Sequence, residues 1–334
     1  MSIGGHNTFR RPEESGARNT QERIRLIVNP RAGAGRAGTG IDALKRAADR
    51  AFAQWEIKVT QAPGHASELA SEAATEGFDL VAAVGGDGTC HEVVNGLIKD
   101  GRARNRKTAF AVVPAGTGGD LTRTLGVPKR LQDALWLAAT GITLPSDVGV
   151  ATFTDQGEQR SRVFINVAGF GANGAVAQTA NNKSKKLGGR VTFLLSTIEV
   201  LASYQPTPVN ITLHTPNGEQ HWSGPLVSGF VANGAYCGGG MWVGKGGTMQ
   251  DGLFNITLIE PTSRVRQAID GRYLFNGNLS RARGIHQYLA TSLSIEPINE
   301  AVVPIELDGE SPGHGPAEFK IVPRCLPVRG GWMP

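Results

Sequence analysis

Phosphate-binding chemistry is concentrated in Val84-Gly85-Gly86-Asp87-Gly88-Thr89, which joins an apolar run at residues 80–83 to a helix-like segment at residues 92–97. Glycines at a strand-to-helix turn let backbone N–H groups approach an anion, and the positive end of the helix dipole favours the charge. The Thr89 hydroxyl adds a hydrogen-bonding group at the helix N-terminus. Asp87 would repel a bare phosphate, so its presence indicates a divalent cation between the two. The stretch therefore predicts a phosphate site with a cation.

The spacing of this turn excludes two common phosphate loops. It lacks the G-x-G-x-x-G of dinucleotide-binding turns, and no Gly-Lys-Ser/Thr follows as in a Walker P-loop. A glycine-rich connection without a ligand is the plainer interpretation. The preceding strand and the added Asp-Gly-Thr favour a different phosphate cradle.

Two further aspartates follow predicted strands or loops of the same region, Asp120 and Asp147. If both converge with Asp87 on one cleft, the three carboxylates repel unless a cation lies among them. They therefore predict Mg²⁺, held in part through water, since this ion takes only one or two carboxylates besides phosphate oxygens. For Asp120 the alternative is an N-cap before the helix-like residues 121–125.

The elements that position these residues alternate between strand and helix in the first half of the chain. Apolar periodicity predicts strands at residues 24–28, 55–60, 78–84 and 108–113, and helices at residues 41–54 and 66–76. Such alternation implies right-handed crossovers and a parallel sheet covered on both faces. Ligands of these sheets gather at the carboxyl ends of the strands. Polar loops at residues 29–33, 85–89 and 114–120 occupy such ends.

After residue 149 the pattern becomes β-rich. Strands are predicted at residues 162–167, 209–214, 226–232, 253–259 and 292–295, with helices near residues 187–203 and 265–273. We therefore expect an α/β plus β-rich fold of two lobes, a parallel-sheet α/β domain and an antiparallel β-sandwich, with a cleft between them. The expected divisions are a disordered leader at residues 1–22, a nucleotide-binding domain at 23–147, a β-rich substrate domain at 148–316, and a segment at 317–334 that returns to the first lobe.

Bulk composition restricts the partners. The 334 residues, 40% of them hydrophobic and 19% charged, suffice for two globular cores. The net charge of +5 is dispersed, which fits an anionic substrate or membrane surface and argues against nucleic acid. Three distant cysteines without metal spacing indicate a reducing cytoplasm. No signal peptide or transmembrane run is present, so we expect a cytoplasmic protein, peripheral at the inner face of the membrane; the sequence leaves a homodimer open.

Six motifs in order make the chain resemble the catalytic-domain family of diacylglycerol and sphingolipid kinases, and more closely its bacterial lipid kinases. The Gly-Gly-Asp-Gly-Thr turn is joined by motifs at residues 29–33, 114–120, 147–149, 251–253 and 308–310. The resemblance implies two lobes around a nucleotide cleft, the first of them phosphofructokinase-like, and ATP as the cofactor. It implies ATP contacts by Asn29, Gly33, residues 85–89, Gly116 and Thr117. The residue types agree with this role, since Asn29 offers a side-chain amide and Arg31 a guanidinium that can bind phosphate through two N–H groups.

Asp308-Gly309-Glu310 follows an apolar run and on its own reads as a β-turn. The resemblance implies instead that Asp308 is the general base for the lipid hydroxyl, and that Glu310 tunes it or holds the nucleotide. Phosphoryl transfer needs little more than in-line positioning and neutralised charge. The family also implies a second, structural Mg²⁺ or Ca²⁺ held by Asp251 and the carbonyls of Thr248 and Leu253, for which a hairpin turn is the alternative.

Several features carry weaker signals. The basic run Lys183, Lys185, Lys186 and Arg190 is either a solvated face, a phosphate contact through Arg190, or a contact with anionic headgroups. The glycine-rich residues 238–244 either border the lipid route or form a plain loop.

Seven histidines show no metal spacing and receive no role. Gly119 replaces the asparagine usual in the family, and residues 99–107 resemble an insertion.

The leading hypothesis is an ATP-dependent lipid kinase acting on diacylglycerol, a sphingoid base or a glycerophospholipid. The alternative within enzymes is a kinase of a soluble substrate, similar to NAD kinases and phosphofructokinases. The alternative outside enzymes is a catalytically reduced nucleotide- or lipid-binding regulator, which Gly119 makes conceivable. The turn at residues 308–310 favours a lipid, and retention of the acidic residues favours activity.

Overall fold

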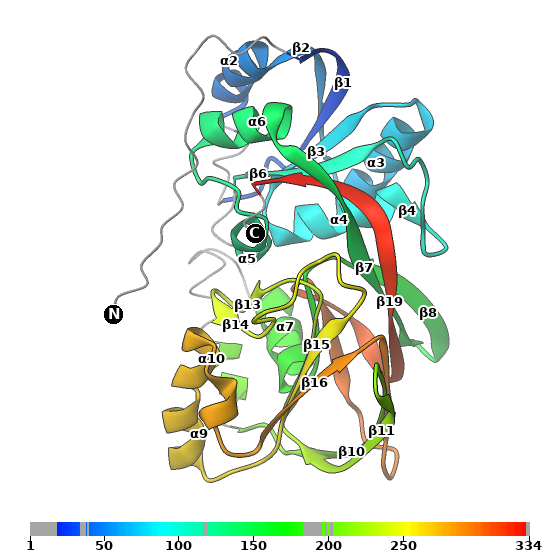
Figure 1. Cartoon of the computed structure of the whole chain (residues 1–334), viewed down its shortest axis with the longest axis vertical. Helices are drawn as coiled ribbons and strands as arrows, with labels where there is room; N and C mark the ends of the chain where they lie inside the picture. Colours follow the sequence, from blue (N-terminus) through cyan, green and yellow to red (C-terminus); the bar gives the residue numbers. More distant parts are fainter. Residues whose placement is uncertain are drawn as a thin grey trace.

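The computed structural model describes residues 19–33, 38, 40–115, 119–182, 196–197, 199–200 and 203–331. Its first half is an α/β lobe around a parallel sheet (Figure 1). The sheet contains β1 (Asn19–Val28), β2 (Phe52–Val59), β3 (Leu80–Gly85) and β6 (Ala109–Pro114), in the order β6-β3-β1-β2. β3 is buried along its whole length, as a central parallel strand should be. The predicted strands and helices of this lobe are all present, with shifted ends.

Helices and one small hairpin connect these strands. They are α2 (Ile41–Ala51), α3 (His65–Thr75), α4 (Asp87–Leu97), α5 (Asp120–Thr124), α6 (Leu131–Thr140), and the hairpin β4 (Ile98–Lys99) with β5 (Arg102–Ala103). The hairpin accounts for part of the insertion-like residues 99–107. α4 begins directly after β3, so the glycine-rich turn lies at the carboxyl end of a central strand.

The second lobe is rich in antiparallel strands. Its strands are β8 (Glu158–Phe164), β9 (Val167–Gly171), β10 (Thr207–Thr215), β11 (Gly218–Leu226), β12 (Ser228–Ala232), β13 (Tyr236–Cys237), β14 (Met241–Trp242), β15 (Phe254–Ile259), β16 (Ile285–Ala290), β17 (Ser292–Pro297) and β18 (Pro304–Leu307). Its helices are α7 (Ala172–Asn182), α9 (Arg264–Asp270), α10 (Arg272–Asn276) and the 3₁₀ turn η2 (Leu279–Arg281). Phe164 packs against Phe254 and Phe319, with ring centroids 5.6 and 6.3 Å apart, in the core of this lobe.

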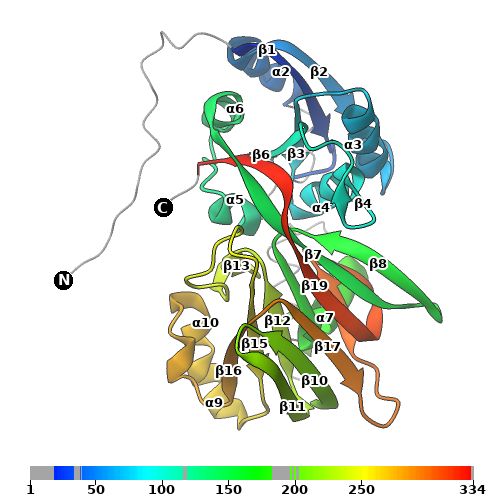
Figure 2. The same ribbon diagram turned by 45° about the vertical axis from the view of Figure 1, so that its right-hand side comes forward.

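Two long strands run through both lobes (Figures 1 and 2). They are β7 (Ile142–Asp155) and β19 (Glu310–Gly330), which pair antiparallel with each other. β19 then pairs parallel with β6, so hydrogen bonds connect strands of both lobes in one 15-stranded sheet. Val148 of β7 packs in the core of the first lobe and Ala151 in that of the second. The expected break after residue 147 therefore falls inside a strand.

The ends of the described chain are tied together in the first lobe. The Arg329 guanidinium forms two hydrogen bonds with the Glu22 carboxylate, at 2.7 and 2.8 Å. Residues 19–22 thus belong to β1, while residues 1–18 of the expected leader lie outside the described residues, as do residues 183–195 with the basic run and Arg190. Within the described chain, no helix combines the length and apolar character needed to cross a bilayer.

Candidate active site

Asp87 is the first residue of α4 and lies among other carboxylates. Burial raises its pKa to about 7, with further increases from the charges of Asp120 and Asp308, while a hydrogen bond from the Leu121 backbone opposes the shift. The three aspartates come from α4, α5 and the turn that follows β18. The lobes therefore bring together carboxylates that are far apart in sequence.

Asp120, 9% exposed, begins α5 and faces the second lobe. Its Oδ2 accepts the backbone N–H of Gly239 at 2.6 Å. Gly239 lies in the connection between β13 and β14, where Tyr236 stacks on Trp242 with ring centroids 5.6 Å apart. The glycine-rich residues 238–244 therefore pack beside the acidic group. Whether a lipid passes them stays a prediction.

Asp308 is held more firmly than its neighbours. It forms the two-residue turn between β18 and β19 with Gly309, both at positive φ as in primed hairpin turns, so the predicted β-turn is present. Four N–H groups point at its carboxylate. Oδ1 accepts from the Asn166 and Val167 backbones at 2.9 and 3.2 Å, and Oδ2 lies 3.0 Å from the Ile165 N and 3.1 Å from His91 Nδ1. A carboxylate offers about four lone-pair positions, so the group is fully oriented.

His91 was given no role in the sequence, yet it contacts the predicted base. It is 4% exposed and lies one turn after Asp87 on α4. The Asn95 amide is 3.3 Å from its Nε2 and also pairs with the Val163 backbone, donating to the carbonyl at 2.8 Å and accepting the N–H at 3.0 Å. The two Asn95 amide protons go to the carbonyls of His91 and Val163, at 2.9 and 2.8 Å. The Asp308 carboxylate only accepts, so the proton on Nδ1 of His91 donates to it. The i, i+4, i+8 spacing from Asp87 was the available signal.

Glu306 is a second residue with no signal in the sequence motifs. Burial raises its pKa to about 8; the Gly309 N–H opposes the shift, and the charges of Asp308, Glu310 and Asp87 add to it. Gly309 N–H donates to its Oε1. Its spacing of two residues from Asp308 was the only signal.

Glu310 reaches the glycine-rich turn from the second lobe. Its Oε1 lies 3.0 Å from the position that a Cβ on Gly88 would take, so only glycine leaves it unhindered there. A Cβ on Gly85 would overlap the Thr89 side chain. Gly85 is thus required by close approach, whereas a side chain at Gly88 would displace the Glu310 carboxylate.

The predicted nucleotide residues of β1 meet the same turn. Asn29 Nδ2 donates to the Thr89 hydroxyl at 3.2 Å, and its Oδ1 accepts the Arg31 backbone N–H at 3.0 Å. Arg31 itself is exposed, and Gly33 ends the described part of this loop. Gly116 and Thr117 lie outside the described residues, so their nucleotide contacts stay predictions.

Asp147 is bound by backbone N–H groups, and a place for it beside Asp87 and Asp120 at a cation stays a prediction. It is fully buried, and its two oxygens accept the backbone N–H groups of Gly252 and Arg324, both at 2.7 Å. Burial raises its pKa, these hydrogen bonds lower it, and nearby Asp251 raises it further. Across the described ranges, no three His, Cys, Asp or Glu side chains form a ready metal-ligand group.

Thr248, Asp251 and Leu253 do lie together. Asp251 accepts the backbone N–H groups of Thr248 at 3.0 Å and Leu253 at 2.9 Å. The turn thus presents N–H donors to the carboxylate, which accounts for the aspartate without a cation. A second metal here stays a prediction.

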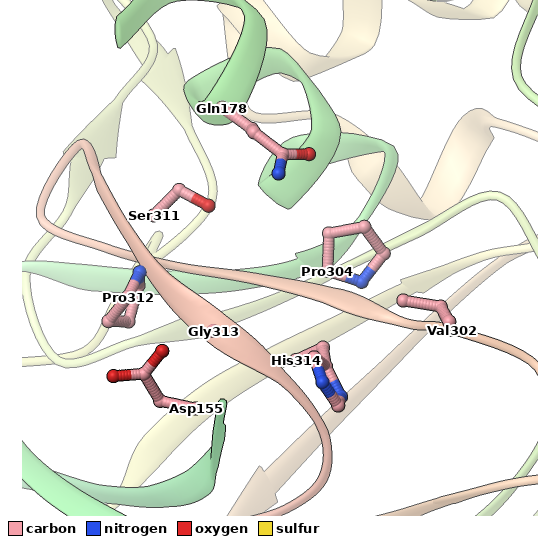
Figure 3. Close-up of a pocket in the computed structure, with 8 residues that line it drawn as sticks. All are labelled: Asp155, Gln178, Val302, Pro304, Ser311, Pro312, Gly313 and His314. Atoms are coloured by element: carbon pink, nitrogen blue, oxygen red, sulfur yellow. The ribbon is translucent and has the colours of Figure 1, made fainter. Parts of the chain in front are cut away.

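A separate hollow lies around the β18–β19 hairpin (Figure 3). Its polar side chains stand apart, with Gln178 on α7 and Asp155 across the strand from it. His314 Nδ1 is 2.8 Å from the Gly315 carbonyl and is satisfied locally. The hollow shows no convergent chemistry.

Known proteins match the chain over both lobes. Residues 23–151 match the diacylglycerol kinase catalytic domain, and residues 166–330 match the YegS C-terminal NAD kinase beta sandwich-like domain. The diacylglycerol kinase of Bacillus subtilis is 30% identical over 298 residues, which cover 89% of this chain and 93% of that protein. A protein named "Probable lipid kinase YegS-like" from Chromohalobacter salexigens is 29% identical over 273 residues, covering 81% of this chain and 82% of that one.

A solved structure extends the comparison to the fold. The crystal structure of a diacylglycerol kinase from Bacillus anthracis superposes with a TM-score of 0.68 at 26% identity, over 92% of this chain and 97% of that chain. The predicted class, a parallel α/β lobe followed by a β-rich lobe, is confirmed.

Proposed function

The chain belongs to the diacylglycerol kinase catalytic-domain family and is a kinase that acts on a lipid, and from this premise we propose that it transfers the γ-phosphoryl group of ATP to a lipid hydroxyl. The observation that carries the proposal is the contact between α4, which begins at the phosphate turn, and Asp308 of the far lobe, whose Oδ2 lies 3.1 Å from His91 Nδ1. Nucleotide and acceptor groups are thereby brought to one place. Diacylglycerol, a sphingoid base and a glycerophospholipid all offer a suitable hydroxyl.

ATP phosphates would lie on the turn at residues 85–89. The N-terminus of α4 directs backbone N–H groups and a positive dipole end toward this turn. Asn29 and Thr89, which are hydrogen-bonded to each other, border it. These features support a nucleotide site without an additional basic loop.

Magnesium fits the residues beside this turn. Burial raises the pKa of Asp87 and the charges of Asp120 and Asp308 raise it further, and a cation beside these carboxylates would favour their ionised form. Asp87 and Asp120 would hold the ion, since Mg²⁺ commonly takes one or two carboxylates with phosphate oxygens and waters. When bound, it would neutralise charge on the transferred phosphoryl group.

Asp308 is the proposed proton acceptor. Its carboxylate already has four N–H contacts, so one of these must break when the lipid hydroxyl donates to it. The contact with the Val167 N–H, at 3.2 Å, is the longest of the four and would break first. His91 and the β8–β9 backbone keep the carboxylate oriented during this exchange.

Labelled ATP tests the proposal directly. The purified protein is incubated with γ-labelled ATP, Mg²⁺ and each lipid class, and label is counted in the organic and aqueous phases. We expect label in a lipid, and Asp308→Asn should lower transfer by about 10²–10⁴-fold while nucleotide affinity stays nearly unchanged. Asp155→Asn, at the far end of β7, is the matched control.

The other outcomes separate the alternatives. Label in a soluble product only would support the NAD-kinase-like or phosphofructokinase-like kinase. ATP binding without any transfer would support the regulator. Action on a lipid would place the protein at the inner face of the cytoplasmic membrane, and a homodimer stays a prediction.

A further inference from the structure

Three large apolar side chains are exposed on α9 and α10. Val265 is 71% exposed, Ile269 is 45% exposed and Phe275 is 60% exposed. Val265 and Ile269 are four residues apart on α9, so they share one side of that helix. Exposed apolar side chains that gather on one element mark an interaction site more often than scattered ones do. We call these three residues and the arginines around them the α9–α10 surface.

The same segment carries much of the positive charge of the protein. Residues 264–283 contain five arginines and one acidic residue, Asp270, a net of +4 in a chain whose net charge is +5. Asp270 is buried and bound to the Arg266 guanidinium at 2.7 Å. Among the side chains that the structure describes here, Arg272, Arg281 and Arg283 are exposed. The α9–α10 surface therefore combines exposed apolar groups with unopposed positive charge.

This surface adjoins the active site. Gly277, which ends α10, packs closely on the second lobe, because a Cβ there would lie 2.8 Å from the Trp242 ring and 2.9 Å from Lys245 Cδ. Trp242 belongs to the β13–β14 hairpin, whose Gly239 donates to Asp120. Figures 1 and 2 show α9 and α10 on one side of the second lobe, next to this hairpin. Packed residues therefore connect the surface to the catalytic carboxylates.

We propose that the α9–α10 surface docks on an anionic lipid bilayer. Val265, Ile269 and Phe275 insert below the headgroups, and the arginines bind lipid phosphates. Apolar insertion together with basic attraction is what holds interfacial helices on membranes. The proposal rests on the proposed lipid kinase function, since docking here brings the hairpin beside Asp120 to the surface that contains the acceptor.

Vesicle flotation of the full chain tests the docking. Binding to vesicles of phosphatidylcholine mixed with phosphatidylglycerol is compared with binding to phosphatidylcholine alone, at low and high salt. We expect binding that needs the anionic lipid and weakens with salt. Val265→Ser with Phe275→Ser should lower the partition coefficient by at least about tenfold. Arg272→Gln and Arg281→Gln should each lower it by about fivefold.

Matched controls come from exposed apolar residues elsewhere. Ile142 and Val302 are 64% and 63% exposed, and Ile142→Ser with Val302→Ser should bind vesicles as the wild type does. Equal binding by the α9–α10 variants and the wild type would overturn the proposal. A change from dimer to monomer in these variants, with vesicle binding unaltered, would also overturn it and assign the surface to a second copy.

Activity measurements separate the membrane-docking proposal from the proposed lipid kinase function. The α9–α10 variants should phosphorylate a short-chain, monodisperse diacylglycerol at the wild-type rate and lose activity on the same lipid in vesicles. A wild type that binds anionic vesicles through this surface but phosphorylates no lipid would leave the docking intact and overturn the lipid kinase function.

Discussion

Two groups of aspartates in this molecule share similar sequence signals and differ in how their charge is balanced. Asp147 and Asp251 present four carboxylate oxygens, and each oxygen accepts a backbone N–H. Asp87, by contrast, has its pKa raised to about 7 beside Asp120 and Asp308. Every oxygen of the first pair is satisfied by a backbone N–H, whereas burial and then the charges of Asp120 and Asp308 raise the pKa of Asp87.

This difference separates structural carboxylates from candidate cation ligands. A buried carboxylate is stable when N–H groups satisfy it, and removing it then leaves those donors without partners. A carboxylate that raises the pKa of its neighbours gains most from a cation. Substitution of Asp87 and of Asp147 by the isosteric amide should therefore have opposite effects on folding.

The largest expected effect is on catalysis at Asp87. Asp87→Asn removes one of the two proposed magnesium ligands, so turnover should fall by about 10²–10³-fold and the magnesium titration should shift to higher concentration. The same change should raise the free energy of unfolding in EDTA, because one of the mutually repelling charges is gone. Turnover across a magnesium series and urea unfolding measure the two effects. An unchanged magnesium titration would make Asp87 a structural residue.

Asp147→Asn should act in the opposite direction on folding. The amide can accept only one of the two N–H groups that now reach the carboxylate, so the other donor stays buried without a partner. We expect the free energy of unfolding to fall by about 1–3 kcal/mol. Urea unfolding beside Asp87→Asn in the same EDTA buffer checks it. If both variants move stability in the same direction, the distinction between the two groups does not hold.

Local features of the site could be predicted from the sequence. The apolar run before Gly85 fixes β3, and the glycines after it fix the phosphate turn, because both depend on neighbouring residues. Long-range pairing could not be predicted. β19 pairs with β7 along both lobes and then with β6, and no local pattern sets that register.

The same limit explains why the partners of Asp147 and the role of His91 could not be predicted. The N–H groups that hold Asp147 come from Gly252 and Arg324, 105 and 177 positions further along the chain. His91 meets Asp308 across 217 positions. Sequence spacing identified carboxylates after strands, but the donors that decide their role come from distant turns.

The smallest expected effect concerns the pH dependence of stability at Glu306. Its pKa rises from 4.5 to about 8 on folding, so between these values the folded state holds the proton more tightly than the unfolded state. Stability is therefore lost as pH rises through this window. Glu306→Gln should unfold less readily than the wild type at pH 8, by about 1–2 kcal/mol once partial exposure is allowed for, and should match it more closely at pH 5.

Urea unfolding in EDTA at both pH values measures this difference. Glu158→Gln, whose side chain is 74% exposed on β8, is the control and should keep the wild-type dependence. The pKa of Asp87 is raised as well, so the free energy of unfolding of Glu306→Gln should still depend on pH, but less steeply than that of the wild type. Adding Asp87→Asn should reduce this pH dependence further. If the free energy of unfolding changes with pH equally in the wild type and in Glu306→Gln, then Glu306 does not contribute to the pH dependence. The cluster of interacting carboxylates would then consist of Asp87, Asp120 and Asp308.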